Sequence, residues 1–216
     1  MFLQTAILAY IVLLGSVVFH EFSHAWMARK LGDESYLVAE RLTLNPLPHI
    51  DILGTVILPF SMLLFRSPFL FGWAKPVAVN PSNLKNPKKD MLWIGFSGPA
   101  TNFLLAFFFT LVFKIPILNS GSLAEAFVAL AILLNLILGV FNLIPLPPLD
   151  GSHIVSGLLP PNLETGYNRI RPFAPFILIF LILTGILGSL IYPVIYLWTA
   201  LFKVNFVNPA IFLLRG

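Results

Sequence analysis

The sequence predicts an all-α polytopic membrane protein that also carries a small membrane-associated β-hairpin or sheet. Composition is the first observation: 58% of the 216 residues are hydrophobic and only 10% are charged, whereas soluble domains contain about 25% charged residues. The second is that uncharged residues form runs as long as the bilayer core, which a helix of ~20 residues crosses. The third is one short segment of partly alternating, β-prone residues that is bounded by turn signals.

We expect residues 1–216 to form one membrane-embedded domain, since the apolar runs leave no room for a second sizeable soluble domain. The chain contains no cysteine, which excludes disulfides, thiolate metal ligands and a cysteine nucleophile. Its net charge of +4 is small, and in a membrane protein basic residues indicate topology before they indicate partners. We therefore expect the lipid bilayer as surroundings and no nucleic acid as partner.

The first helix is expected over residues 1–30. Its first 19 residues carry no charge and lack the basic start and the small-residue cleavage site of a signal peptide, so we expect the segment to be retained. Arg29 and Lys30 stand at the end of this helix. Because cytoplasmic loops are rich in lysine and arginine, this end is expected at the cytoplasmic face.

Two segments after the first helix are not expected to span. Residues 35–48 predict a β-hairpin, because Tyr36 to Leu44 partly alternate between Gly-Asp and Asn-Pro turn signals. This hairpin either offers an edge to an extended substrate or has no function. Residues 50–74 contain an uncharged run of 14 that includes Pro59, which is too short to span comfortably. Since lysines follow, we predict a re-entrant hairpin or a pair of short helices there.

Residues 91–113 and 123–149 are expected to span the membrane outward and back. The first span contains Gly98 to Asn102, where small residues allow close approach of another backbone. The second ends in Asn142 to Gly151, a stretch whose three prolines cannot continue a helix. Residues 172–202 carry no charge and form either one long tilted span or a hairpin.

The chemistry is predicted by His20-Glu21-Phe22-Ser23-His24, an H-E-x-x-H motif at the end of the first uncharged run. In a helix the two histidines lie on one face, one turn apart, where both imidazoles can bind one zinc ion. Glu21 is then beside the metal, where its carboxylate can accept a proton from the water that attacks a carbonyl. Ionisable groups in an apolar helix are costly unless they have partners. The motif therefore predicts metal-assisted amide hydrolysis.

Asp150 is a candidate third ligand. The out-and-back pair of spans returns the chain to the membrane face that holds His20 and His24, and two histidines with one carboxylate leave an open position typical of catalytic zinc. The alternative is that Asp150 and Gly151 simply form a turn. With Asp150 as ligand, one Zn²⁺ per chain is expected within the helix bundle, near the cytoplasmic face.

Three further polar residues have open roles. Asn102 either orients a ligand or substrate loop or makes an ordinary polar contact between helices. His49 either approaches the site as a substrate contact or transient ligand, or is a solvated histidine at the membrane interface. His153 lies three residues beyond Asp150 and is either a group behind the ligands or a loop residue.

With its H-E-x-x-H motif, its Gly98-Pro99-Ala100-Thr101-Asn102 stretch and its terminal Asp-Gly after a proline-rich break, the chain resembles the site-2 protease family of intramembrane zinc metalloproteases. It is similar to compact prokaryotic members that lack PDZ and CBS domains. The resemblance implies zinc held by His20, His24 and Asp150, water activation by Glu21, and a contact of Asn142 with the substrate backbone. It also implies cleavage of transmembrane segments of other proteins in a prokaryotic cytoplasmic membrane.

The alternative function is a zinc-binding membrane transporter or a non-catalytic membrane scaffold. A transporter would more often show repeated halves and polar residues along a pathway through the membrane, whereas the ionisable groups here gather at one face. A scaffold would not need Glu21, which is intact.

Overall fold

The fold was determined from a computed structural model, which describes residues 2–65, 72–116 and 122–208. The described part of the chain is helical and contains no β-strand. Its helices in chain order are α1 (Phe2–Leu31), α2 (Tyr36–Arg41), η1 (Leu47–His49), η2 (Ile52–Ile57), α3 (Leu58–Leu64), η3 (Pro81–Asn83), α4 (Pro87–Phe113), α5 (Leu123–Asn142), α6 (Asp150–Leu158), α7 (Pro161–Asn168), η4 (Arg171–Phe173), α8 (Ala174–Leu183) and α9 (Ile186–Phe202).

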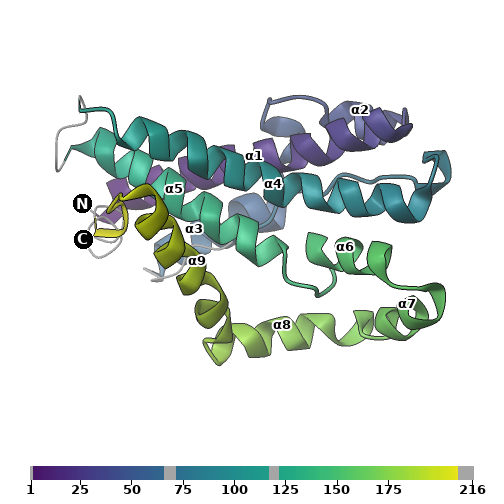
Figure 1. The fold of residues 1–216 in the computed structure, drawn as a ribbon. Helices are drawn as coiled ribbons and strands as arrows, with labels where there is room; N and C mark the ends of the chain where they lie inside the picture. The colour runs from purple at the N-terminus through teal and green to yellow at the C-terminus, as the bar shows by residue number, and fades with distance from the viewer. Residues whose placement is uncertain (1, 66–71, 117–121, 209–216) are drawn as a thin grey trace.

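Helices α1, α4 and α5 lie side by side and form the centre of the molecule (Figure 1). Helix α6 packs against α4, and α9 returns from the far end of α8 to pack against α5. Four helical stretches of the described chain are long and apolar enough to cross a membrane: Ile7–Leu31, Pro87–Phe113, Leu123–Asn142 and Pro161–Leu183. This confirms the predicted all-α polytopic membrane protein.

The core of this bundle is built around α5. Leu130, Ile132 and Leu136 on α5 are completely buried and pack with small residues of the neighbouring helices, among them Ala9 on α1 and Ala106 on α4. In a membrane, small residues at such contacts let helix backbones approach closely, which increases van der Waals packing. The central position of α5 holds α1 and α4 in a fixed relation to each other, and these two helices carry most of the site described below.

The predicted β-hairpin over residues 35–48 is wrong. Within the described chain this stretch contains α2 and the short η1 instead of strands. Val38 and Arg41, three residues apart on α2, are both buried, and this is the spacing of one helix face. The alternation over these residues is short, and the leucine, alanine, glutamate and arginine in it all favour a helix.

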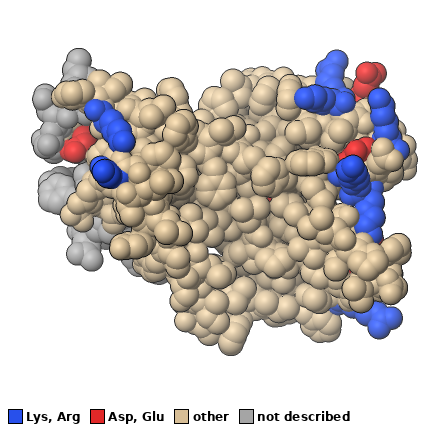
Figure 2. Space-filling view, in the orientation of Figure 1, with Lys and Arg blue, Asp and Glu red and all other residues tan. Residues whose placement is uncertain are grey.

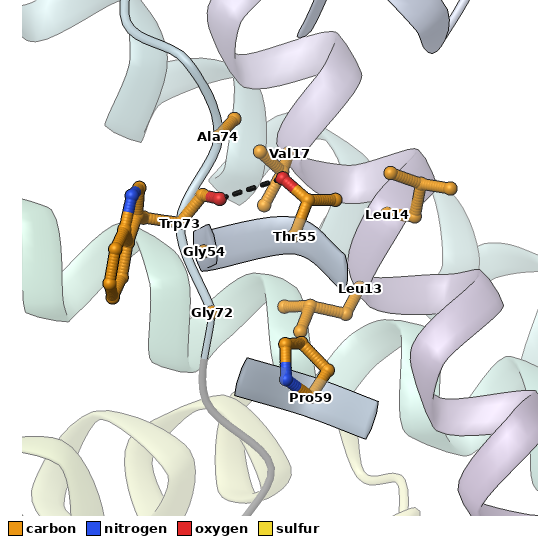
Figure 3. Close-up of a pocket in the computed structure, with 9 residues that line it drawn as sticks. All are labelled: Leu13, Leu14, Val17, Gly54, Thr55, Pro59, Gly72, Trp73 and Ala74. Carbon is orange, nitrogen blue, oxygen red and sulfur yellow. Dashed lines mark hydrogen bonds between the residues drawn. The ribbon is translucent and has the colours of Figure 1, made fainter. Parts of the chain in front are cut away.

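The segment that follows folds back on itself beside α1. Helices η2 and α3 run in one direction, and the chain comes back so that the Trp73 amide donates to the Gly54 carbonyl at 3.2 Å. The Thr55 hydroxyl donates to the Trp73 carbonyl at 2.8 Å (Figure 3). Between this segment and α1 lies a small apolar pocket, lined by Leu13, Leu14, Val17, Gly54, Thr55, Pro59, Gly72, Trp73 and Ala74. After it, residues 73–80 form neither helix nor strand. The Val77 amide donates to Glu21 on α1, and Val77 and Val79 pack against the cluster that contains Ala25 and Ala28 of α1.

The last apolar stretch, expected over residues 172–202, is divided into α8 and α9. Gly185 between them has a φ of +75°, a left-handed conformation that glycine adopts without steric cost. Helix α8 lies away from the central bundle while α9 turns back toward it (Figure 1). The turn at Gly185 therefore gives a bent helical pair.

Charged side chains gather at the two ends of the molecule, and the face shown in Figure 2 is uncharged between them. One end carries the carboxyl end of α1 with Arg29 and Lys30 and the beginning of α4 with Lys88 and Lys89. Such an uncharged band between charged ends is what the hydrocarbon core of a bilayer requires.

Candidate metal centre

Three predicted ligands meet inside the helix bundle. The ligand atoms of His20, His24 and Asp150 lie within 4.8 Å of one another. The Nε2 atoms of the two histidines are 3.0 Å apart. Asp150 Oδ2 is 3.0 Å from His20 Nε2, and its Oδ1 is 3.3 Å from His24 Nε2. Both histidines are buried, at 6% and 7% exposed, so their contacts must come from the protein or from a bound group.

The hydrogen bonds behind the histidines determine which ring nitrogen carries the proton. His24 Nδ1 donates to the Ile94 carbonyl at 2.7 Å, and His20 Nδ1 donates to Asn102 Oδ1 at 2.6 Å. An oxygen of either kind only accepts, so a neutral histidine keeps its lone pair on Nε2. Two bare nitrogens and a carboxylate then face one point, and the buried Asp150 Oδ2 receives no hydrogen bond. This donor set fits a metal cation, and its His₂-carboxylate composition is that of catalytic zinc.

Helix α4 leaves room for this cluster because glycines face it. A methyl group at Gly98 would lie 2.6 Å from His20 Nε2 and closer still to His24 Nε2. A methyl group at Gly95, one turn earlier, would lie 3.0 Å from the Asp150 carbonyl and 2.9 Å from His153 Cβ. Contacts below 3.0 Å are repulsive, so the two glycines allow α1 and α6 to approach α4.

Asp150 is placed by the break after α5. The chain leaves α5 at Asn142, and its prolines prevent the helix from continuing. Helix α6 then begins at Asp150 itself. Gly151 lies against the Leu143 and Ile144 carbonyls, where a side chain would collide with backbone. Asp150 and Gly151 thus begin a helix, and the alternative in which they only form a turn does not account for the carboxylate, which points to the two histidines.

Glu21 lies beside the cluster but has a different neighbour. Its side chain is half-buried, and its Oε2 accepts a hydrogen bond from the Val77 amide at 3.2 Å. Val77 belongs to the segment of residues 73–80, so this segment and α1 meet at Glu21. The sequence did not predict this partner, because a backbone amide has no signature in sequence.

The remaining predicted residues lie outside the three-ligand cluster of the described chain. Asn142 ends α5, and its Nδ2 donates to the Leu138 carbonyl at 3.1 Å. His49 is buried at 1% exposed, and its Nε2 donates to the Thr43 carbonyl at 2.9 Å. His153 is half-buried on α6 beside Gly95, and burial lowers the pKa of its imidazole. Asn102 is completely buried behind His20.

Comparison with known proteins gives a consistent result. The sequence profile of Peptidase family M50 matches residues 8–120 and 113–185. The chain is 34% identical to "Putative zinc metalloprotease YwhC" of Bacillus subtilis, over 86% of this chain and 84% of that protein. It is 27% identical to "Putative zinc metalloprotease Rip2" of Mycobacterium tuberculosis, over 84% and 68%. It is also 27% identical to "Zinc metalloprotease MJ0392" of Methanocaldococcus jannaschii, over 69% and 34%. No solved structure matches the chain.

Two histidines and a carboxylate surround one point inside a membrane helix bundle. This arrangement is typical of one class of proteins, the membrane-embedded metalloenzymes. Within that class, this chain belongs to peptidase family M50. The result confirms the predicted site-2 protease resemblance and the predicted type of enzyme. It disfavours the transporter and the scaffold, since the matched family is one of peptidases.

Proposed function

We propose that this protein is an intramembrane zinc metalloprotease that hydrolyses peptide bonds in or near transmembrane segments of other membrane proteins. In this function His20, His24 and Asp150 hold the zinc ion, and Glu21 is the general base. The observation that carries the proposal is the donor set itself. Two bare Nε2 atoms 3.0 Å apart, next to a buried carboxylate oxygen without a hydrogen bond, need a cation between them.

Zinc in such a site acts as a Lewis acid that activates water and polarises the carbonyl to be cleaved. Glu21 accepts the proton of the attacking water, because its carboxylate follows His20 directly on α1. The same side chain then delivers that proton to the leaving amide nitrogen. The Val77 amide, which donates to Oε2, holds the carboxylate in place and leaves the other oxygen available for the proton.

A transmembrane substrate must unwind before its carbonyl can be attacked, since a helix occupies its carbonyls with its own hydrogen bonds. The segment of residues 73–80 supports binding of the unwound strand. The amides of Trp73, Lys75 and Val77 donate inward, to Gly54, His49 and Glu21.

In an extended chain alternate residues face opposite sides, so Ala74 presents its backbone groups outward, where a substrate strand can pair with them. The Val79 amide donates to the Val77 carbonyl at 3.1 Å, so the chain turns at Ala78 and the proposed pairing ends before it. We assign Asn142, at the end of α5, a contact with the same strand.

The depth of the site supports cleavage near one membrane face. Glu21 precedes Arg29 by eight residues of one continuous helix, which corresponds to about 12 Å along the membrane normal. We propose that this face is the cytoplasmic face of a prokaryotic membrane, because Arg29, Lys30, Lys88 and Lys89 gather there. The whole chain acts as a single membrane-embedded protease domain.

The proposed ligand set is tested by measuring bound zinc and cleavage in the same purified preparations. Asp150→Ala and His24→Ala should each lose most of the zinc and the cleavage of a membrane-spanning substrate. His153→Gln changes a histidine on α6 that lies outside the cluster and should keep the zinc. Full zinc content in Asp150→Ala and His24→Ala would refute the assignment.

A further inference from the structure

A buried chain of hydrogen bonds lies behind His20 and joins three transmembrane helices. Asn102 on α4 and Asn135 on α5 are both 0% exposed, and Ser16 on α1 is 5% exposed. His20 Nδ1 is 2.6 Å from Asn102 Oδ1, and Asn102 Nδ2 is 2.9 Å from Asn135 Oδ1. Asn135 Nδ2 is 2.9 Å from Ser16 Oγ, which donates to the carbonyl of its own helix at Val12.

The direction of donation along this chain is determined at Asn135. Its Nδ2 lies 2.8 Å from the Ala131 carbonyl, and a carbonyl oxygen can only accept. The amide must therefore present Nδ2 to Ala131 and Oδ1 to Asn102. Asn102 must then present Nδ2 to Asn135, which leaves its Oδ1 for His20. A backbone carbonyl on α5 thus determines how His20 on α1 is protonated.

The two histidines differ in this respect. His24 Nδ1 donates directly to the Ile94 carbonyl. Because a carbonyl can only accept, this hydrogen bond determines the His24 tautomer without a further partner. His20 donates to an amide side chain, which can accept through Oδ1 or donate through Nδ2 after a rotation of 180° about χ2. A rotated Asn102 would donate to His20 Nδ1 and move the imidazole proton to Nε2, the atom that faces His24 and Asp150.

We propose that Asn135 is a positioning residue of the metal centre. Through Asn102 it holds His20 in the Nδ1-protonated tautomer, so that Nε2 is free to bind the metal. Ser16 completes the arrangement by accepting the second Nδ2 hydrogen of Asn135. The inference rests on the proposed function, because it takes His20 as a zinc ligand.

The test compares zinc affinity, by competition with a chelator, in the full-length protein and three variants. Asn135→Leu removes the amide, and we expect about tenfold weaker zinc binding, the lower end of the 10–100-fold range for groups behind metal ligands. Asn135→Asp should restore the affinity, because a buried carboxylic acid is neutral and offers one acceptor and one donor in the same places. The ligand-field spectrum of the Co²⁺-substituted protein should change in Asn135→Leu and return in Asn135→Asp.

Thr110→Val is the matched control. Thr110 on α4 is also completely buried, and its hydroxyl accepts a hydrogen bond from Trp198 Nε1 on α9 at 2.9 Å. The variant therefore loses a buried contact between helices that does not reach the metal centre. We expect it to bind zinc and Co²⁺ as the unchanged protein does. If it weakened zinc binding as much as Asn135→Leu, a general loss of packing would explain both and the proposal would be overturned.

Wild-type zinc affinity and an unchanged cobalt spectrum in Asn135→Leu would also overturn the role of Asn135 while leaving the proposed function intact. Failure of the unchanged protein to bind zinc would instead contradict the proposed function itself. Nitrogen NMR of the zinc-free wild-type protein gives a readout that does not depend on any variant folding. His20 Nδ1 is expected to carry a proton, and an unprotonated Nδ1 would overturn the inference.

Discussion

Gly98 is the residue on which the space at the metal centre depends most directly. Its α-carbon faces both histidines, and any side chain there would occupy the position of the ligand nitrogens. Glycine inside a helix costs up to about 1 kcal/mol relative to alanine. Glycine is nevertheless needed at this position, because only a hydrogen atom fits there between α4 and α1.

Gly98→Ala is therefore expected to abolish zinc binding even though alanine favours helix formation. The methyl group would lie 2.6 Å from His20 Nε2, so one histidine must leave its position. Zinc content of the purified protein measures the effect. Gly15→Ala on α1 is the control, because a methyl group there meets nothing within 4 Å. Equal zinc content in both variants would show that α4 does not confine the site.

The cluster of the three proposed ligands could be predicted from sequence because the position of each follows from a simple geometric rule. His20 and His24 share a face by helical period, and Asp150 reaches them because two spans return the chain to the same face. Asn135 could not be assigned in this way, although it is one of only two amide side chains in the uncharged run of residues 126–149, the other being Asn142. Its partner Asn102 is 33 residues away on another helix, and only the packing of α4 on α5 brings the two together.

At the level of segments, hydrogen bonds of the Asp33 side chain attach the stretch of residues 73–80 to the end of α1. Its Oδ2 accepts from the Asn80 amide at 2.7 Å, and its Oδ1 accepts from Asn83 Nδ2 at 2.8 Å and from the Ser35 amide at 3.1 Å. Burial by itself would raise the pKa of Asp33, but these hydrogen bonds outweigh it and hold the pKa below its ordinary value of 3.8. The stretch that contacts Glu21 through Val77 is thereby attached to the helix that carries Glu21.

Asp33→Ala should destabilise this attachment by about 2 kcal/mol or more, since hydrogen bonds to a charged group are worth ~1.5–3 kcal/mol each. The pH dependence follows from the lowered pKa. The stabilising contribution is fully present above pH 3.8 and is lost as the pH falls through the lower folded-state value. Thermal unfolding in detergent, followed from neutral to acidic pH, measures it. The wild-type midpoint should fall more steeply in the acidic range than that of Asp33→Asn, and parallel curves would contradict this account.

The long helices could be predicted but the short helix α2 could not, for a physical reason. Uncharged runs such as residues 91–113 must be helical, since a bilayer leaves no other way to satisfy the backbone. Residues 36–41 lie at the end of the bundle, where a strand and a helix are both possible. There the burial of Val38 against α1 and α4 favours a helix. This packing cannot be predicted from a pattern of six residues.

The distribution of charge over the whole molecule predicts its orientation in the membrane. Exposed Lys89 stands at the beginning of α4 and exposed Lys114 follows its end, so the two mark opposite faces. The absence of cysteine allows single-cysteine variants without further changes. In intact cells a membrane-impermeant maleimide should label Lys114→Cys and should label Lys89→Cys only after lysis. The reverse pattern would place the site near the outer face.

Glu21→Gln tests whether the protein is a zinc hydrolase that uses Glu21 as its base. Purified wild-type and variant proteins are given a single-span membrane substrate whose helix is weakened by glycine or proline, and bound zinc is measured in both. We expect about one zinc ion in each protein and a loss of cleavage of at least ~100-fold in the variant. Cleavage by Glu21→Gln at the wild-type rate, with zinc bound, would show that Glu21 is not the base.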